Sequence, residues 1–134
     1  MVDVRNLDPA EETLVRAVGI PVVSVGGDFP GAPLGPAVDA LAQRCDALYL
    51  HVDADILDER FLPDNGTPEP NGPDVFQVLA AVDRVMATGK VLVYAVVAVS
   101  AGGPGREISL AAGKELIRGG LESWQRYGAP SLAV

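Results

Sequence analysis

The stretch at residues 47–58 constrains the fold most strongly, because an apolar run changes there into a cluster of acids. Its first part, residues 47–52, suits a buried parallel strand that is covered on both faces and shows no clean polar alternation. Asp53, Asp55 and Asp58 then fall at the carboxyl end of that strand. Ligands bind at this end of the strands in open α/β sheets.

Asp53 and Asp55 stand at positions i and i+2, so an extended backbone would direct both carboxylates to the same side. Two converging acids repel each other unless a cation or a shared proton neutralises them. The alternative for an Asp-x-Asp sequence is a pair of solvated loop acids just past a strand. The apolar run before the pair and the Pro- and Gly-rich loop after it favour a metal site at Asp53 and Asp55.

Helical and strand-like segments alternate along the rest of the chain. Apolar periodicity and turn residues predict helices at residues 9–17, 36–44, 74–88 and 107–123, and strands at residues 20–25, 46–52 and 91–99. Such alternation is typical of a parallel sheet with right-handed crossovers and helices on both faces. We therefore predict one α/β domain over residues 1–134, with three αβα layers and a small parallel sheet of about three strands.

Two further features of the sequence predict how this domain packs. The helix positions expected to face inward are Val38, Leu41 and Ala42, then Val75, Val78, Leu79, Val82 and Met86, and finally Leu110, Leu116 in part, Ile117 and Leu121. The loop at residues 59–73 is too long for a simple connector, and its prolines restrict it. We expect this loop to form a shaped wall beside the acids rather than a flexible excursion.

Charge and composition limit the class of partner. The formal net charge of −8 argues against nucleic acid and anionic membranes as partners, since both need a basic surface. No apolar run reaches the length of a transmembrane helix, and the N-terminus lacks the apolar core of a signal peptide. Cys45 is the single cysteine, which excludes an internal disulfide and fits a cytoplasmic location.

The acid cluster also carries a resemblance to a known family. Residues 50–58, Leu-His-Val-Asp-Ala-Asp-Ile-Leu-Asp, followed by Leu-Pro at 62–63 and by residues 66–72, resemble the arginase/agmatinase (ureohydrolase) family. That family ends a strand with Asp-x-Asp-x-x-Asp-Pro and continues into a loop similar to Pro-Gly-Thr-Pro-x-x-Gly-Gly. Residues 4–11 also look like the segment that precedes this half of the family's fold. The resemblance spans nearly the whole chain but only the C-terminal half of the family's domain.

The resemblance implies a role for each acid. Asp53 matches the aspartate that bridges two manganese ions, and Asp55 matches the aspartate that binds the second ion. In the family, the metal pair lowers the pKa of a bridging water, and the hydroxide attacks a guanidinium carbon of a small guanidino substrate and releases urea. Asp58 matches an acid that helps to set the loop. His51 could approach the metal region, but structural roles are favoured for both His51 and Asp58.

The sequence departs from the family pattern in several places. The family takes its other metal ligands from a Gly-Gly-Asp-His and an Asp-Ala-His-x-Asp motif. Residues 26–28 imitate the first motif, but Phe29 replaces the histidine and the order along the chain differs, so we interpret the match as coincidence. His51 is the only histidine, so a metal pair with two histidine ligands cannot be built from this chain alone. Residues 98–100 lack the acid that grips the guanidinium in many members, and Glu59 replaces the usual proline.

These observations leave three functional hypotheses. The first is the C-terminal portion of an arginase-like manganese hydrolase, which alone binds Mn²⁺ weakly and is inactive because two acids are a poor cage for a divalent ion. The second is a degenerate interaction module whose unused sheet edge pairs with another chain or with a second copy of itself. The third is an Asp-x-Asp phosphatase of the haloacid dehalogenase type, although Ile56 and Leu57 stand where that family has Gly-Thr.

Overall fold

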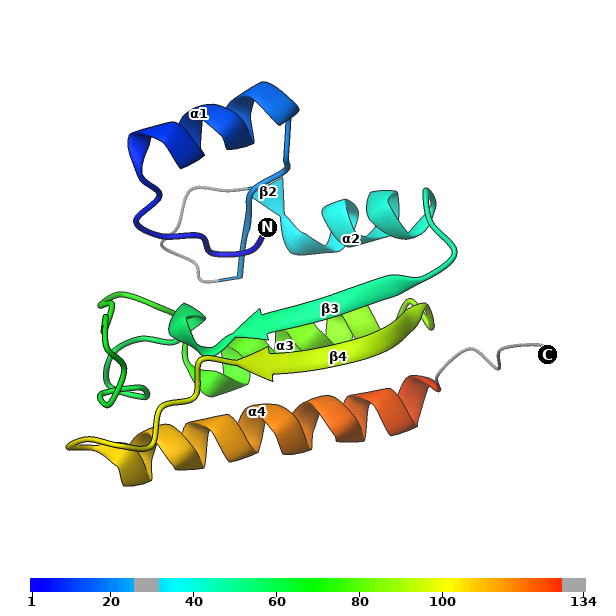
Figure 1. Ribbon diagram of the computed structural model, residues 1–134. Helices are drawn as coiled ribbons and strands as arrows, with labels where there is room; N and C mark the ends of the chain where they lie inside the picture. The colour runs from blue at the N-terminus through cyan, green and yellow to red at the C-terminus, as the bar shows by residue number, and fades with distance from the viewer. Residues whose placement is uncertain (26–31, 129–134) are drawn as a thin grey trace.

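The computed structural model describes residues 1–25 and 32–128, in which helices and strands alternate (Figure 1). The tripeptide at residues 26–28 lies outside the described residues. The elements are α1 (Pro9–Val18), β1 (Val23–Ser24), β2 (Ala32–Pro33), α2 (Leu34–Ala42), β3 (Leu48–Asp53), the 3-10 helix η1 (Ala54–Ile56), α3 (Val75–Met86), β4 (Val91–Val97) and α4 (Arg106–Tyr127). In the part of the chain that is described, no helix combines the length and the apolar character needed to cross a bilayer.

Local sequence signals place the helix ends. The Asp8 carboxylate accepts hydrogen bonds from the backbone N–H groups of Ala10 and Glu11, and the Glu11 side chain accepts one from Asp8 N–H. α1 then ends at Gly19, whose φ of 69° is accessible to glycine at little cost. Asp74 begins α3 with the same reciprocal capping arrangement. The predicted positions of both helices are confirmed to within two residues at each end.

The strands form two parallel pairs. β3 pairs with β4, from Leu48 opposite Val91 to Asp53 opposite Val97, which confirms the α/β class with a small parallel sheet. β1 pairs with β2 and does not join β3, although we expected a single sheet of about three strands. The reason lies at Val23, whose N–H donates to the carbonyl of Met1 and whose carbonyl accepts from Asp3 N–H. β1 therefore has neighbours on both of its edges, and no edge is left for β3.

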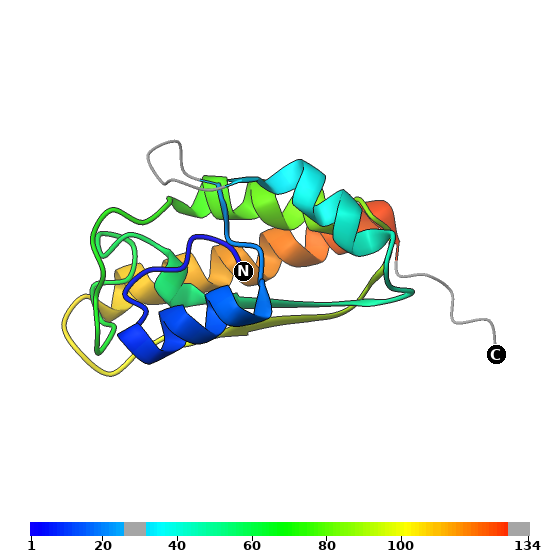
Figure 2. The same ribbon diagram turned by 90° about the horizontal axis from the view of Figure 1, so that it is seen from above.

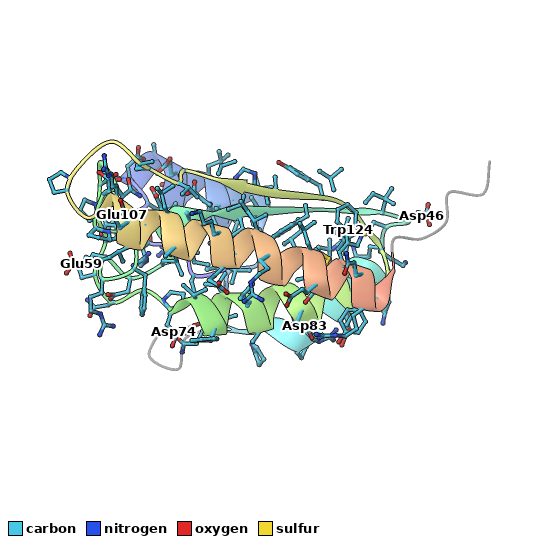
Figure 3. The ribbon with its side chains drawn as sticks, turned by 90° about the horizontal axis from the view of Figure 1, so that it is seen from below. Asp46, Glu59, Asp74, Asp83, Glu107 and Trp124 are labelled. Atoms are coloured by element: carbon cyan, nitrogen blue, oxygen red, sulfur yellow. The ribbon has the colours of Figure 1, made fainter. Side chains whose placement is uncertain are left out.

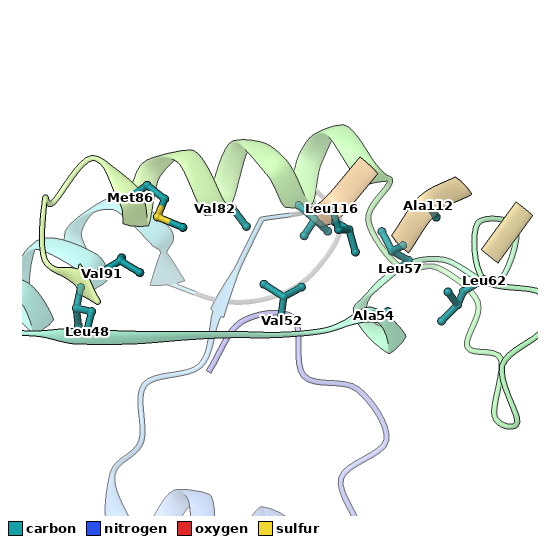
Figure 4. Close-up of a cluster of buried hydrophobic side chains, with 11 residues drawn as sticks. Leu48, Val52, Ala54, Leu57, Leu62, Val82, Met86, Val91, Ala112 and Leu116 are labelled. Atoms are coloured by element: carbon teal, nitrogen blue, oxygen red, sulfur yellow. The ribbon is translucent and has the colours of Figure 1, made fainter. Parts of the chain in front are cut away.

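One face of the β3–β4 pair holds the core. α3 and α4 run side by side against it (Figure 2). Leu48 and Val52 on β3 point towards Val82 and Met86 on α3 (Figure 4). The remaining core residues are Ala54, Leu57, Leu62, Val78, Val91, Ala112 and Leu116. The predicted inward stripe of α3 is confirmed, because Val78, Val82 and Met86 are buried and the other two positions are partly buried.

The opposite face of the β3–β4 pair is open. Leu48 and Val52 are buried, whereas Tyr49, His51 and Asp53, which alternate with them, are exposed. Tyr49 is 63% exposed and lies opposite Val93, which is also exposed. The prediction that β3 is covered on both faces is therefore wrong for the residues described, because helices cover one face only.

Three helix positions expected to face inward do not. Leu41, Ile117 and Leu121 are all about half exposed, although Leu116 is fully buried. The inner face of α4 consists instead of small residues around Leu116, namely Ser109, Ala112, Gly113, Gly120 and Ser123. A Cβ on Gly120 would lie 2.2 Å from the ring of Tyr94, so this glycine lets the helix approach β4 closely. The closeness of this contact explains why the bulkier side chains of α4 point outward.

The far end of α4 is tied to α3 through one acid. Asp83 of α3 accepts hydrogen bonds from Ser123 Oγ at 2.6 Å and from Tyr127 Oη at 3.0 Å, and it pairs with Arg126 (Figure 3). The hydrogen bond from Ser123 is the main cause that lowers the pKa of Asp83 below its ordinary value. Near the other end of α4, Ser109 Oγ accepts the backbone N–H of Asp64 at 3.1 Å and so contacts the loop at residues 59–73.

Candidate metal centre

Asp53 ends β3 and organises the turn that follows. Its Oδ1 accepts the backbone N–H of Asp55 at 3.0 Å and so caps the short helix η1. Asp55 consequently lies in a 3-10 turn and not on the extended backbone that its spacing from Asp53 predicts. The second carboxylate oxygen of Asp53 accepts no hydrogen bond from the described residues, so it remains open to a ligand.

Asp55 is half-buried beside Asp53. Its Oδ1 accepts a hydrogen bond from the side-chain amide of Asn65, in the loop at residues 59–73. Burial is the main cause that raises the pKa of Asp55 above its ordinary value, and the negative charge of Asp53 adds to it. The hydrogen bond from Asn65 and the positive charge of Arg5 act in the opposite direction. A cation between the two acids would relieve their repulsion.

Arg5 holds the backbone around these acids. One terminal nitrogen of its guanidinium donates to the carbonyl oxygens of Asp55, of Ile56 at 2.8 Å and of Leu57 at 3.2 Å. The other donates to the carbonyls of Glu69 at 3.2 Å and of Pro70 at 3.0 Å. Sequence reasoning missed this role, because its only signal was the resemblance of residues 4–11 to a family segment. Arg5 thus joins the N-terminal segment to both sides of the acid-bearing turn.

Asp53 and Asp55 line one cavity of about 350 Å³. The opposite wall is the N-terminal segment at residues 2–6, and Thr67 and Glu69 from the long loop complete the lining. The prediction that this loop forms a wall beside the acids is confirmed. The structure therefore brings Asp53 and Asp55 together at the carboxyl end of β3, although the turn does so and not an extended strand.

Asp58 lies apart from the cavity and fastens the long loop. It is only 4% exposed, and its Oδ1 accepts from the backbone N–H of Arg60 at 3.1 Å and from Arg60 Nε at 2.6 Å. Its Oδ2 accepts the N–H of Asn71 at 2.8 Å, which closes the loop on itself. The hydrogen bond from the Arg60 guanidinium holds the pKa of Asp58 below its ordinary value. This geometry corresponds to a structural acceptor.

His51 is on the open face of β3, where Asp53 also points by strand alternation. Its Nδ1 lies 3.0 Å from the hydroxyl of Tyr49, and the two rings meet edge to face at 5.8 Å. His51 does not line the cavity of the two acids. Within residues 1–25 and 32–128, no group of three or more His, Cys, Asp or Glu side chains is arranged to hold a metal ion.

Comparison with known proteins gives consistent matches. A model described as the arginase family matches residues 1–119. An agmatinase from Pyrococcus horikoshii is 30% identical over 79 residues, which are 59% of this chain and 28% of the agmatinase. The solved arginase of Entamoeba histolytica, in complex with L-ornithine, has a TM-score of 0.71 and 20% identity, over 90% of this chain and 41% of that chain.

A second solved structure extends the comparison. The proclavaminate amidino hydrolase of Streptomyces clavuligerus has a TM-score of 0.71 and 26% identity, over 95% of this chain and 43% of that chain. The chain thus spans less than half the length of the proteins that it matches.

Proposed function

The chain belongs to the arginase family, and from this premise we propose that it supplies Asp53 and Asp55 to a two-manganese centre of a hydrolase that releases urea from small guanidino compounds. The single observation that carries the proposal is the pairing of these two carboxylates in one cavity at the carboxyl end of β3. Carboxylate oxygens are hard ligands that suit Mn²⁺. Each carboxylate also has one oxygen without a hydrogen bond from the described residues.

The chain's own residues would hold and orient part of such a centre. Asp53 and Asp55 would each offer one oxygen, while Asn65 and the Asp55 N–H fix the direction of the other. Arg5 keeps the turn and the loop in register through their carbonyl groups. The chemistry that manganese supplies in such a centre is the acidification of water, which provides hydroxide at neutral pH. His51 and Asp58 would act from outside the ligand set, His51 near the open face and Asp58 through the loop.

We expect this chain alone to bind Mn²⁺ weakly and to release no urea. A divalent ion of this class takes about six ligands, and two carboxylates leave most of them to other donors. The family's two histidine-bearing motifs would supply those donors from a segment beyond the one that this chain matches. His51 is the sole histidine here.

Manganese titration followed by electron paramagnetic resonance tests the assignment of Asp53 and Asp55. Asn substitution of either acid should abolish the residual binding, because each removes one anionic ligand. Asp46→Asn, which makes the same charge change before β3 and far from the long loop, is the matched control (Figure 3). Equal binding by wild type and Asp53→Asn would contradict the assignment. Micromolar affinity, or urea release from arginine or agmatine, would contradict the incompleteness of the site.

A non-catalytic interaction module is the second candidate function. The exposed apolar side chains of Tyr49, Val93 and Val97 on the open face of the β3–β4 pair favour it. Association with a partner that persists in EDTA and in Asp53→Asn would support this candidate over the hydrolase. Release of phosphate from p-nitrophenyl phosphate with Mg²⁺, abolished in Asp53→Asn, would instead favour the phosphatase hypothesis.

A further inference from the structure

Two asparagines in the loop at residues 59–73 precede a glycine, in the dipeptides Asn65–Gly66 and Asn71–Gly72. In such a dipeptide the backbone nitrogen of the glycine can attack the side-chain carbonyl carbon of the asparagine, because glycine has no Cβ that hinders the approach. Asparagine is one of the thermolabile residues of proteins. The two dipeptides have the same intrinsic chemistry, so their surroundings in the fold decide which of them reacts.

Hydrogen bonds hold the side chain of Asn65 in a position that suits this attack. Its Oδ1 accepts the backbone N–H of Thr67 at 3.2 Å, and this turn bends the side chain back over the peptide bond to Gly66. The same hydrogen bond stabilises the negative charge that develops on Oδ1 when the carbonyl carbon is attacked. The nitrogen that would leave, Nδ2, donates to Asp55. The reacting amide is therefore oriented by the loop on one side and by Asp55 on the other.

Gly66 has the freedom that the attack requires. It is exposed, and a Cβ built on it would meet no other heavy atom within 4 Å. Its N–H donates no hydrogen bond to any residue that the structure describes, so its nitrogen is available as the nucleophile. Thr67 is exposed as well, so water reaches the reacting groups from the same side.

The second dipeptide is restrained. The N–H of Asn71 donates to Asp58 Oδ2 at 2.8 Å, and its φ of 64° lies in the left-handed region. A Cβ on Gly72 would lie 2.5 Å from the backbone nitrogen of Asp58 and 2.6 Å from the carbonyl oxygen of Ile56. The peptide bond between Asn71 and Gly72 therefore cannot turn without displacing the acid-bearing segment. Asn71 is an internal reference with the same chemistry and less freedom.

We propose that Asn65 is a site of spontaneous deamidation, and that the product is a carboxylate beside Asp55 which helps to hold a hard divalent cation. The Gly66 nitrogen forms a bond to Cγ of Asn65, and the bond from Cγ to Nδ2 breaks. The proton of the Gly66 N–H passes to the departing nitrogen, which leaves as ammonia. Water then opens the cyclic imide at either carbonyl and gives aspartate or isoaspartate. Water is the only co-reactant, and no group is oxidised or reduced.

The product changes the charge around Asp55. The amide that donates to Asp55 Oδ1 becomes a carboxylate, so a negative charge replaces a hydrogen-bond donor. Asp55, Glu59 and Glu69 line a small hollow together with residue 65, and the acids there repel one another unless a cation neutralises them. Carboxylate oxygens suit hard cations such as Mn²⁺. The cation step rests on the proposed function because it uses Asp55, whereas the deamidation itself does not.

Peptide mapping by mass spectrometry after incubation of the folded chain at mildly alkaline pH tests the deamidation. The conversion of amide to acid should be about tenfold faster at Asn65 than at Asn71, which corresponds to about 1.4 kcal/mol in the barrier. In urea the two rates should become similar, because the restraints on Asn71 and Gly72 are lost. Gly66→Ala, which has room for its methyl group, should slow the reaction at Asn65 and leave Asn71 unchanged.

Manganese titration followed by electron paramagnetic resonance tests the cation step. Asn65→Asp should bind Mn²⁺ about tenfold more tightly than the amide form, because it adds one anionic ligand beside Asp55. The deamidated wild-type chain, separated by anion exchange through its added charge, should bind more tightly as well, and it gives a second measurement if Asn65→Asp does not fold. Asn71→Asp makes the same charge change at an exposed position of the same loop and should leave the affinity unchanged.

Several results would overturn the proposal. Equal rates at Asn65 and Asn71 in the folded chain, or an unchanged rate in Gly66→Ala, would contradict the deamidation site. Equal Mn²⁺ affinity of the amide and acid forms, or an equal gain in Asn71→Asp, would contradict the cation step. Failure of the proposed function has a different signature. In that case Asp53→Asn would leave the binding of Mn²⁺ unchanged, while Asn65 would still deamidate faster than Asn71.

Discussion

Replacing Arg5 with alanine removes the guanidinium that joins the N-terminal segment to the acid-bearing turn. Its two terminal nitrogens carry four protons, and these are shared among five carbonyl oxygens, so no more than four hydrogen bonds form at once. A net hydrogen bond contributes about 0.5–1.5 kcal/mol, and Arg5 is only partly buried. Taking the lower part of that range, we expect Arg5→Ala to reduce the free energy of unfolding by about 2–4 kcal/mol.

Urea denaturation followed by circular dichroism measures this loss, and Arg16→Ala is the matched control. Arg16 bridges Glu12 one helical turn away at 2.5 Å, but both side chains are exposed, so its removal should cost about 0.3–0.5 kcal/mol. Arg5→Lys keeps the charge but not the planar fork, and should recover less than half of the stability. If Arg5→Ala and Arg16→Ala unfolded at the same urea concentration, the guanidinium would not hold the turn and the loop together.

The same substitution has an effect on Asp55. The charge of Arg5 is one of the causes that lower the pKa of Asp55, so Arg5→Ala should raise that pKa further, and Arg5→Lys should restore it in part. A carboxyl ¹³C titration by NMR reads this change. If Arg5→Lys restores the pKa of Asp55 more fully than it restores stability, the charge of Arg5 sets the pKa and its hydrogen bonds set the stability.

Four further predictions concern close packing and titration. Gly120→Ala should lower the free energy of unfolding by about 1–3 kcal/mol through overpacking against Tyr94, and the better helix propensity of alanine offsets up to about 1 kcal/mol of this loss. Gly66→Ala has open space around the added methyl group and should leave the stability nearly unchanged. The pKa of Asp58 is lowered in the folded protein, so the ionised side chain stabilises the fold at pH values above its unfolded pKa. This stabilisation is lost as the pH falls through the folded pKa. In Asp58→Asn the urea midpoint should therefore depend less on pH at the acid end of the range. The pKa of Asp55 is raised in the folded protein, so ionisation of its carboxyl group destabilises the fold as the pH rises. Asp55→Asn should therefore increase the urea midpoint at neutral pH, and a decrease would contradict the direction of this pKa shift. Burial raises the pKa of Tyr94 to about 12, which an ultraviolet titration should detect, and Tyr94→Phe should cost about 1 kcal/mol by removing the bond to an α4 carbonyl.

The sequence predicted best the features that neighbouring residues determine. The cap at Asp74 and the apolar stripe of α3 lie within a few helical turns, and both are confirmed. The position of Asp53 at the end of a parallel strand is confirmed for the same reason, because the apolar run and the acids are adjacent. Asp53 and Asp55 as metal ligands stay a prediction.

Features that depend on distant residues were not predictable from local pattern. Arg5 contacts carbonyl groups more than 50 positions along the chain, and no periodicity signals such a contact. The separate pairing of β1 depends on Met1 and Asp3, which precede it by a helix. The apolar run of β3 encodes burial on both faces, and the described residues cover only one of them, so Tyr49 is exposed where its sequence context predicts burial.

The hydrogen bond by which Asp53 caps the turn after β3 affects the free energy of binding a ligand at the two acids. Its hydrogen bond to Asp55 N–H, together with the bond from Asn65 to Asp55, restricts both carboxylates to few rotamers before any cation arrives. The side chains lose this conformational entropy during folding, so binding of a ligand does not reduce it a second time. If the proposed metal centre forms, such preorganised acids would coordinate the ion without rearrangement.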